Sequence, residues 1–373
     1  MKIAHVVRQY YPSVGGLEDY TYNLAIEQRA KGHDVVVITL NTDFQTGEQL
    51  PAVDQHMGIE IRRVPWRGSM RYPIATLDLD LLNSMDLVHV HAVDFFIDYL
   101  SLMKRLGRLQ ATLVLCTHGG FFHTQKHQWL KKLFFNTVTR FTLSGVDGVI
   151  CNSTNDQAVF EKIFARCVMV NNGIRLKKFG EGNGGPVATT DDLIYLGRFS
   201  SNKRLAWLIE AYAGLASPSG LLKIIGRSKT GDAQQLQALI DKLDCGARVK
   251  LLLDIDDAAI ADAIISAKAT VSASAYEGFG LGVVELMSYG LIPFLSTDPL
   301  SFGDFVRDSE AGVTFEVGAD NFDIQYQKLI ANWSSATAAN AAHYARRFSW
   351  TAVSEEIFNV YESTLEKSVR AYR

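Results

Sequence analysis

The sequence predicts an α/β protein made of two doubly wound domains, each a parallel sheet with helices on both faces. Three observations support this. A chain of 373 residues is too long for one ordinary hydrophobic core. Short runs rich in β-branched residues alternate with longer amphipathic segments, and the alternation restarts after a glycine-rich stretch at 179–192. Hydrophobic residues make up 47% and charged residues 21%, which is the composition of a packed protein and excludes disorder.

The expected strands of the first half are almost continuously apolar, as strands buried on both faces of a parallel sheet are. They cover 2–7, 34–40, 59–64, 86–92, 111–118, 147–153 and 167–173. Helical segments separate these strands, and the first such segment, 17–32, ends at Gly32. We therefore expect one parallel sheet in the first half.

The second half repeats this pattern after a linker. The stretch 179–192 has four glycines, one proline and no apolar periodicity. The expected strands beyond it cover 192–199, 221–226, 249–255, 269–274, 291–296 and 312–317. Neither half contains the GxGxxG pattern, so the usual nicotinamide fingerprint is missing.

Charge and cysteine content exclude several classes of protein. The formal charge of −3 gives no overall attraction to nucleic acid, so no nucleic-acid partner is expected. The four cysteines lack zinc-type spacing and are expected to be reduced core thiols. The first residues are apolar only as far as Arg8, which predicts neither a signal peptide nor a membrane span. We expect a cytoplasmic protein.

Ligands of open parallel sheets lie beyond the carboxyl ends of the strands. Gly15 and Gly16 follow the first expected strand and precede a helix, whose first N–H groups and positive dipole end suit a phosphate. The alternative is a turn that needs glycine geometry.

A basic segment follows the first strand of the second half. Arg198 and Lys203 leave this strand end, with Asn202 and Arg204 close by. A diphosphate suits such a place, because guanidinium binds phosphate oxygens in a bidentate way and ammonium acts as a point charge. The alternative is a solvated basic turn.

Two glutamates flank a glycine-rich loop in YEGFGLGVVE. Gly278 and Gly280 allow the backbone to approach a ligand, and the expected helix from about Leu281 to Tyr289 presents N–H donors to it. Glu285 lies one turn into this helix, where its carboxylate suits a vicinal diol such as a ribose. Glu277 precedes the loop and suits a second polyol. Two polyols joined by a diphosphate describe a nucleotide-sugar, although helix-capping acids explain either glutamate singly.

Four motifs together resemble the retaining glycosyltransferases with the GT-B fold, known as glycosyl transferases group 1. They are the Glu277-to-Glu285 motif with its internal GFG, GRxxxxK from Gly197 to Lys203, the stretch 171–174 (NNGI), and the glycine pair 15–16. The resemblance implies two Rossmann-like domains that face a cleft. The expected parts are an acceptor domain at 1–178, a nucleotide-sugar domain at 179–345, and a C-terminal helix at 346–373 that returns to the first domain.

The resemblance also implies roles for the candidate residues. Arg198 and Lys203 are expected on the diphosphate, Glu277 on the donor sugar and Glu285 on the nucleotide ribose. The other donor-binding positions are Gly15 and Gly16, which would close the cleft, and the loop residues Phe279, Gly280 and Leu281. His118, at a strand end in LVLCTHGG, matches a family histidine that contacts the donor sugar. Gly282 departs from the family pattern, which often has proline there, and predicts a looser loop.

Enzymes of this family retain the anomeric configuration, and the departing phosphate helps to take the acceptor's proton. The expected catalytic residues are Arg198, Lys203, His118 and Glu277, of which the first two are the principal ones because they face the developing phosphate charge. A double displacement through a protein nucleophile stays open as an alternative.

Metal is not expected, and neither is another cofactor. Two D-x-D patterns, at 78–80 and 254–256, match metal-dependent glycosyltransferases of another fold. The first lies outside any expected strand end, and the second suits the start of a helix.

A basic, aromatic segment points to the acceptor. No Asp or Glu occurs from 99 to 146, and cations there alternate with large apolar side chains. Lys126, Trp129, Lys131 and Lys132 are expected to rest on anionic lipid at the inner face of the plasma membrane, which predicts a peripheral enzyme with a lipid-linked sugar acceptor. The alternative is a helix packed within its own domain.

The sequence around the motifs favours one nucleotide-sugar as the donor substrate. The stretches HVHAVDFF, THGGFFHT and AYEGFG are similar to bacterial mannosyltransferases that extend polyprenyl-diphosphate-linked oligosaccharides for exopolysaccharide. This similarity implies GDP-mannose. A UDP-sugar donor, a nucleotide-sugar epimerase and a non-catalytic binding protein of the same fold remain alternatives.

Overall fold

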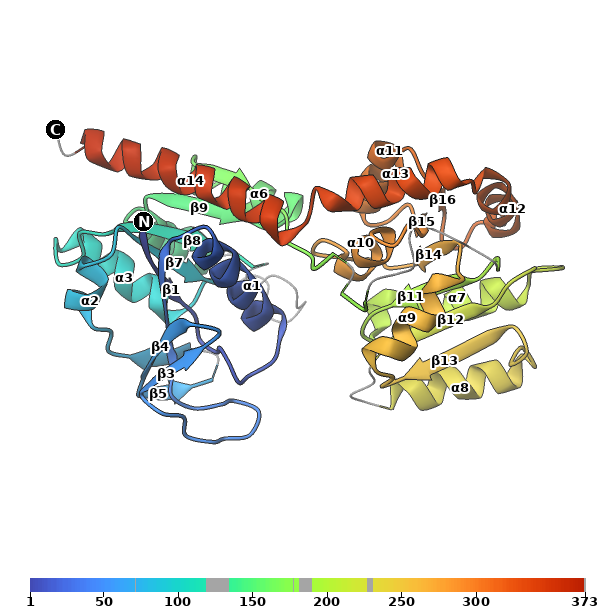
Figure 1. Cartoon of the computed structure of the whole chain (residues 1–373), viewed down its shortest axis with the longest axis horizontal. Helices are drawn as coiled ribbons and strands as arrows, with labels where there is room; N and C mark the ends of the chain where they lie inside the picture. The colour runs from blue at the N-terminus through green and yellow to red at the C-terminus, as the bar shows by residue number, and fades with distance from the viewer. Residues whose placement is uncertain (71, 119–133, 177, 181–189, 227–230, 372–373) are drawn as a thin grey trace. The chain divides into compact units, whose positions relative to one another are not determined.

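The computed structural model describes residues 1–70, 72–118, 134–176, 178–180, 190–226 and 231–371 (Figure 1). The chain divides into two compact units. The first comprises Met1–Gly173 with Trp350–Arg373, and the second comprises Ile174–Ser349. The expected boundaries lay at 178/179 and 345/346, a few residues away on each side.

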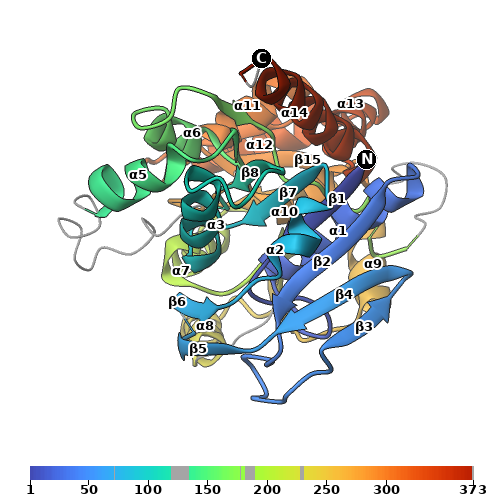
Figure 2. The ribbon, with the colours of Figure 1, turned by 90° about the vertical axis from the view of Figure 1, so that its left-hand side faces the viewer.

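The first unit is built on an eight-stranded sheet with the order β10-β9-β8-β7-β1-β2-β4-β3. Figure 2 shows its strands from β8 to β3. Its strands are β1 (Lys2–Val6), β2 (Asp34–Leu40), β3 (Val53–His56), β4 (Ile59–Val64), β7 (Leu87–His91), β8 (Thr112–Cys116), β9 (Gly148–Cys151) and β10 (Cys167–Met169). All neighbours pair in parallel except β3 and β4. Every strand expected in the first half is present, so the prediction of a parallel sheet is confirmed.

Three strands of the first unit were not predicted. The edge strand β3 reads VDQH, and its side chains alternate between exposed and half-buried positions. The strands β5 (Trp66–Ser69) and β6 (Tyr72–Ala75) form a separate antiparallel pair. None of them is a continuous apolar run, because none is covered on both faces, and the criterion that found the buried strands therefore missed them.

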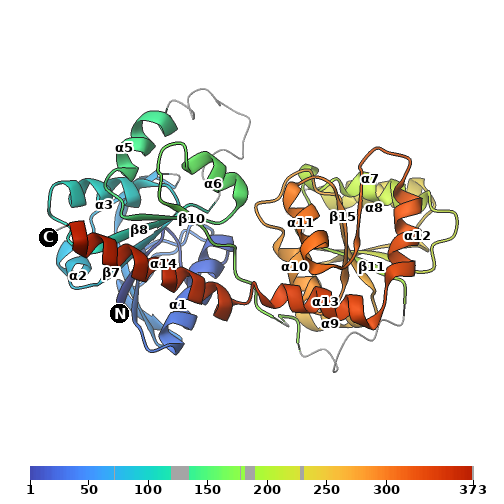
Figure 3. The ribbon, with the colours of Figure 1, turned by 90° about the horizontal axis from the view of Figure 1, so that it is seen from above.

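Helices cover the sheet of the first unit. They are α1 (Gly16–Ala30), α2 (Leu79–Asn83), α3 (Phe95–Arg105), a π-helical turn (Phe135–Thr139) that continues into α5 (Arg140–Leu143), α6 (Thr154–Phe160) and α14 (Trp350–Ala371). α14 contacts α1, β8 and β9, and Figure 3 shows it beside α1. Its buried side chains Trp350, Val353, Ile357 and Tyr361 belong to the same core cluster as Ile3 of β1.

The C-terminal helix begins later than predicted. The expected helix started at 346, but α13 (Ser335–Arg346) ends there and α14 starts at Trp350. Phe348, which lies within the range expected for that helix, packs instead in the second unit, with its ring centroid 5.0 Å from that of Phe279 and 5.3 Å from that of Tyr344. Phe348 and Trp350, two positions apart, thus belong to different hydrophobic cores, which one continuous helix cannot explain.

The second unit contains a six-stranded, wholly parallel sheet with the order β13-β12-β11-β14-β15-β16. Its strands are β11 (Leu193–Leu196), β12 (Leu222–Gly226), β13 (Val249–Leu253), β14 (Ala269–Ser272), β15 (Ile292–Ser296) and β16 (Val313–Phe315). Its other helices are a 3-10 turn (Ser201–Lys203), α7 (Leu205–Ala213), α8 (Asp232–Lys242), α9 (Asp257–Ile265), α10 (Leu281–Met287), α11 (Leu300–Ser309) and α12 (Phe322–Asn332). The six predicted strands are all present.

No helix in the described part of the chain is both long enough and apolar enough to cross a bilayer. All four cysteines are free thiols; Cys116, Cys151 and Cys245 are buried and Cys167 is half-buried.

Candidate active site

Two neighbouring strand ends of the second unit are joined by an ion pair. β11 and β14 lie side by side in parallel, so the loops that follow them leave the same edge of the sheet. Lys203 Nζ, beyond β11, lies 2.5 Å from Glu277 Oε1, beyond β14. Their side chains are only 15% and 16% exposed. Ser274 Oγ donates a 2.8 Å hydrogen bond to the same carboxylate oxygen, so Glu277 is held from two sides.

Two hydrogen bonds hold these two loops against each other. Asn202 Nδ2 donates to the carbonyl of Tyr276 at 3.1 Å, and the N–H of Ala275 donates to the carbonyl of Asn202 at 2.8 Å. The expected phosphate site and the expected sugar site therefore form one rigid edge.

The cations of the basic segment separate in the structure. Arg198 is exposed, and its guanidinium forms no ion pair with any residue that the structure describes. The hydroxyl of Tyr195 donates to the backbone carbonyl of Arg198 at 3.0 Å, which fixes the backbone at Arg198. Arg204 has a φ of +51° and lies 3.8 Å from Asp298. Lys203 is thus neutralised by Glu277, while Arg198 is left open to an anion.

The glycines of the loop serve close packing. Gly280 caps α10 with a φ of +101°, and a Cβ there would lie 3.1 Å from the Phe302 ring. A Cβ on Gly282 would lie 2.3 Å from the carbonyl oxygen of Leu196 in β11. The prediction that Gly282 loosens the loop is wrong, because this residue lies inside α10 and lets the helix approach the sheet. Phe279 is buried and Leu281 is exposed at the helix start.

Glu285 lies in α10, as the sequence predicts, and has a partner that was not predicted. Lys178 Nζ lies 3.0 Å from Glu285 Oε1, with the lysine side chain 33% and the glutamate side chain 13% exposed. Each of the two glutamates is therefore paired with a lysine. The signal for Lys178 was present in NNGIRLKKF, where basic residues follow the NG-I motif directly.

In the first unit, Gly15 and Gly16 form the start of α1. Gly15 is the N-cap, and its carbonyl accepts from the N–H of Asp19 at 2.8 Å; Gly16 has open space around its Cα. The first turn also carries Glu18, whose pKa is raised by burial and by the nearby charges of Asp19 and Asp43. A negative first turn suits the helix dipole but competes with a phosphate.

His118 follows β8 in a left-handed conformation, with a φ of +47°. Its N–H donates to Asn152 Oδ1 at 3.1 Å, and its ring lies edge-on to Tyr20 with centroids 4.4 Å apart. Nε2 lies 3.1 Å from Nδ1 of His91. Burial lowers the pKa of His118 to about 3, so its ring is neutral at physiological pH.

Sequence comparisons agree with this arrangement. Residues 14–178 match the model described as Glycosyltransferase Family 4, and residues 183–348 match the model described as Glycosyl transferases group 1. The chain is 37% identical to the GDP-mannose:cellobiosyl-diphosphopolyprenol alpha-mannosyltransferase of Xanthomonas oryzae, over 98% of this chain and 97% of the relative. It is 33% identical to the protein of that description from Komagataeibacter xylinus, over 99% and 95%.

The protein belongs to the group 1 glycosyltransferases.

Solved structures of other proteins share the fold of this glycosyltransferase. Sucrose-phosphate synthase from Thermosynechococcus elongatus superimposes with a TM-score of 0.72 at 20% identity, covering 98% of this chain and 99% of that one. Anabaena HepE, solved in complex with UDP, also gives 0.72 at 18% identity, covering 97% and 100%. The prediction of the GT-B fold is confirmed.

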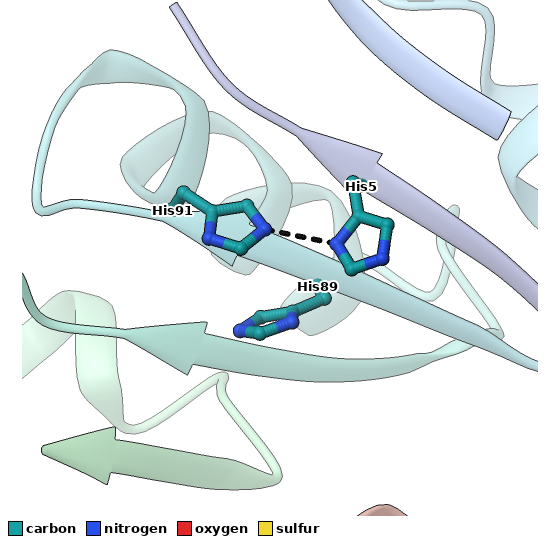
Figure 4. Close-up of side chains that lie close together, drawn as sticks. All are labelled: His5, His89 and His91. Carbon is teal, nitrogen blue, oxygen red and sulfur yellow. Dashed lines mark hydrogen bonds between the residues drawn. The ribbon is translucent and has the colours of Figure 1, made fainter. Parts of the chain in front are cut away.

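Three further histidines of the glycosyltransferase were not predicted as site residues. His5 lies on β1, and His89 and His91 lie on the adjacent strand β7; all three are fully buried (Figure 4). The signal was the HVH pattern, since residues two apart on a strand share a face. One ring nitrogen of each histidine lies within 4.8 Å of one nitrogen of each of the other two, close enough for these atoms to be considered as ligands of one metal ion. However, hydrogen bonds already use both nitrogens of His5 and His91 and Nδ1 of His89.

The D-x-D patterns of the glycosyltransferase cap helices. Asp78 accepts from the N–H groups of Asp80 and Leu81 at the start of α2. Asp256 accepts from the N–H of Ala259 at the start of α9, as expected. The absence of a bound metal stays a prediction.

The predicted membrane and acceptor residues Lys126, Trp129, Lys131 and Lys132 lie outside the residues that the structure describes.

Proposed function

We propose that this glycosyltransferase moves a mannosyl group from GDP-mannose to a polyprenyl-diphosphate-linked oligosaccharide, with retention at the anomeric carbon. The observation that carries the proposal is the similarity, at 33–37% identity, to three proteins described as GDP-mannose:cellobiosyl-diphosphopolyprenol alpha-mannosyltransferases. These matches cover at least 95% of each relative, so the whole chain and not one domain supports the proposal.

The Lys203–Glu277 pair supplies the chemistry. When GDP departs, negative charge grows on its β-phosphate, and cations held in place beforehand stabilise that charge most. Glu277, which itself accepts a hydrogen bond from Ser274, holds the Lys203 ammonium, while exposed Arg198 provides the second cation. Among the described residues the contacts of Glu277 all use Oε1, which leaves Oε2 for a sugar hydroxyl.

Glu285 is proposed to hold the ribose. Its carboxylate can accept hydrogen bonds from both hydroxyls of a vicinal diol, and the Lys178 ammonium, 3.0 Å from Oε1, orients it. GT-B neighbours with UDP share the fold at 18% identity, so a UDP-sugar donor is the second candidate.

The enzyme is proposed to act without a bound metal and to associate with the anionic inner face of the plasma membrane. The first point is supported by the capping roles of Asp78 and Asp256. The second is supported by the lipid-linked substrates in the names of the relatives and by the basic, aromatic sequence around Lys126, Trp129, Lys131 and Lys132.

The test is a transfer assay with purified protein, labelled GDP-mannose or UDP-glucose, and synthetic cellobiosyl-diphosphopolyprenol in vesicles. We expect transfer from GDP-mannose, undiminished by EDTA, and an α-linked product by NMR. Transfer from UDP-glucose alone would replace the proposed donor, and dependence on a divalent ion would overturn the metal-free mechanism. For the membrane, we expect salt-sensitive flotation with anionic vesicles that is lost when Lys126, Lys131 and Lys132 are changed to Ser.

A further inference from the structure

A continuous chain of hydrogen bonds leads from His118 into the buried core of the first unit. His118 Nε2 lies 3.1 Å from His91 Nδ1, and His91 Nε2 lies 2.9 Å from His5 Nδ1, the bond drawn in Figure 4. His5 Nε2 lies 2.7 Å from the side-chain oxygen of Gln28 on α1. Beyond Gln28, its Nε2 donates to the hydroxyl of Tyr361 at 3.2 Å, and that hydroxyl lies 2.6 Å from His89 Nδ1.

Each link in this chain needs one donor and one acceptor, so the protons are ordered. A neutral imidazole carries its proton on one nitrogen only, and the other accepts. The amide oxygen of Gln28 can only accept, so His5 carries its proton on Nε2 and accepts at Nδ1. His91 must then donate from Nε2 to His5 and accept at Nδ1. His118 must in turn donate from Nε2 to His91.

The other end of the chain obeys the same order. The amide nitrogen of Gln28 can only donate, so the Tyr361 hydroxyl accepts from it and donates its own proton to His89 Nδ1. His89 Nε2 then carries a proton, and this atom is buried without a hydrogen-bond partner among the described residues.

We propose that Gln28 is a positioning residue: through His5 and His91 it fixes His118 as the Nε2–H tautomer and leaves His118 Nδ1 as a hydrogen-bond acceptor for a donor-sugar hydroxyl. The tautomer follows from the hydrogen bonds with the Gln28 oxygen facing His5, whereas its use on a sugar rests on the proposed function. A 180° rotation of the Gln28 amide would exchange donor and acceptor in every hydrogen bond of the chain and would make His118 an Nδ1–H donor. The orientation of this one side chain therefore sets the positions of the protons.

Burial supports a neutral chain. His5, His89, His91 and Tyr361 are fully buried and Gln28 is 1% exposed, so a charged ring would lose its hydration. Burial lowers the pKa of His5 to about 4 and moves the pKa values of His89 and His91 well below their usual range.

The first measurement is ¹⁵N NMR of the full chain with labelled histidine, in which protonated and unprotonated ring nitrogens are well separated. The His118 signals are assigned by their loss in His118→Asn. We expect Nε2 of His118 to be protonated in the wild type and its tautomers to mix in Gln28→Met, which keeps the side-chain length but cannot donate and accepts only weakly. A protonated Nδ1 in the wild type, or an unchanged tautomer in Gln28→Met, overturns the proposal.

The matched control is Tyr361→Phe, which removes the hydroxyl beyond Gln28 and keeps the His5–Gln28 bond. We expect it to preserve the His118 tautomer. Loss of the tautomer in this variant would show that packing and not the Gln28 oxygen sets it, and would also overturn the proposal.

Kinetics give the second readout. We expect Gln28→Met to lower kcat/KM for GDP-mannose about tenfold, the effect of one hydrogen bond, and to leave the Kd for GDP within twofold, because GDP lacks the mannosyl group. An equal loss of GDP affinity would indicate general disruption and count against the positioning role. Should the wild type prove inactive with GDP-mannose, the proposed donor fails while the tautomer measurement still decides the role of Gln28.

Discussion

Lys203 and Glu277 are 74 positions apart in the sequence, yet Nζ and Oε1 lie 2.5 Å apart at the shared edge of β11 and β14. Because Lys203 is expected to face the departing phosphate, Lys203→Ala should lower kcat by about 10²- to 10³-fold, as loss of one charge-stabilising donor does in other enzymes. Steady-state kinetics with saturating donor would measure this.

The control for Lys203 is Lys223→Ala. Lys223 Nζ pairs with Asp192 at 2.7 Å, and its side chain is 16% exposed, close to the 15% of Lys203. Asp192 directly precedes β11 and Lys223 is the second residue of β12, so this pair lies at the opposite ends of the strands from Lys203 and Glu277. A comparable loss of kcat in both variants would mean that lost stability, and not phosphate stabilisation, explains the effect.

Gly282→Ala should destabilise the second unit by about 2 to 3 kcal/mol, since a Cβ 2.3 Å from the Leu196 carbonyl forces α10 away from β11. Gly278→Ala is the matched control, because a Cβ there meets no atom within 4 Å. Urea unfolding, monitored by circular dichroism, measures the free energy of unfolding of both variants. Equal stability of the two variants would contradict the close approach of helix and strand.

Glu285→Gln should raise the Kd for GDP about tenfold to a hundredfold, because hydrogen bonds to a charged acceptor are worth about 1.5 to 3 kcal/mol each. Glu316→Gln, at an exposed acid of the same unit, should leave the Kd unchanged. Isothermal titration with GDP and with guanine base separates ribose contacts from base contacts. Weakening of base binding alone would refute the ribose assignment.

Acid should destabilise the first unit. The pKa values of His5, His89, His91 and His118 are all lowered by burial, so below pH 6.5 the unfolded chain binds more protons than the folded one. The free energy of unfolding therefore falls as pH falls, by up to about 1.4 kcal/mol per pH unit for each histidine. Hydrogen exchange measures this. Between pH 7 and pH 5, the free energy of opening should fall more for the amides of β1 and β7 than for those of β11 and β14. Stronger protection of β1 at pH 5 would contradict this.

Asp94 acts in the opposite direction. Burial raises its pKa to about 7 despite Arg8, whose Nε lies 3.0 Å away. Its folded form thus keeps a proton that the unfolded chain loses near pH 4, and stability falls as pH rises towards 7. Asp94→Asn keeps the acceptor for the N–H of Phe96 at the start of α3. The measurement is the melting temperature of this variant minus that of the wild type. We expect this difference to be several degrees larger at pH 8.5 than at pH 5.5. A difference independent of pH would exclude a raised pKa.

The buried strands could be predicted because their signals are local, and so could the places of Arg198, Lys203, Glu277 and Glu285 after β11 and β14. A strand covered on both faces must be apolar throughout, and a turn that approaches a ligand needs glycine within a few positions. Edge strand β3 has no such requirement, so it gave no signal.

By itself, then, the sequence determined two parallel sheets, the family and the loops that carry its motifs. Only the tertiary structure decided which side chains meet. Lys178 reaches Glu285 across 107 positions, and Gln28 reaches Tyr361 across 333. Hydrophobic periodicity records which face of an element is buried, but not which element covers it. Ion pairs and proton order depend on distances of about 3 Å between groups that only the packed sheets bring together.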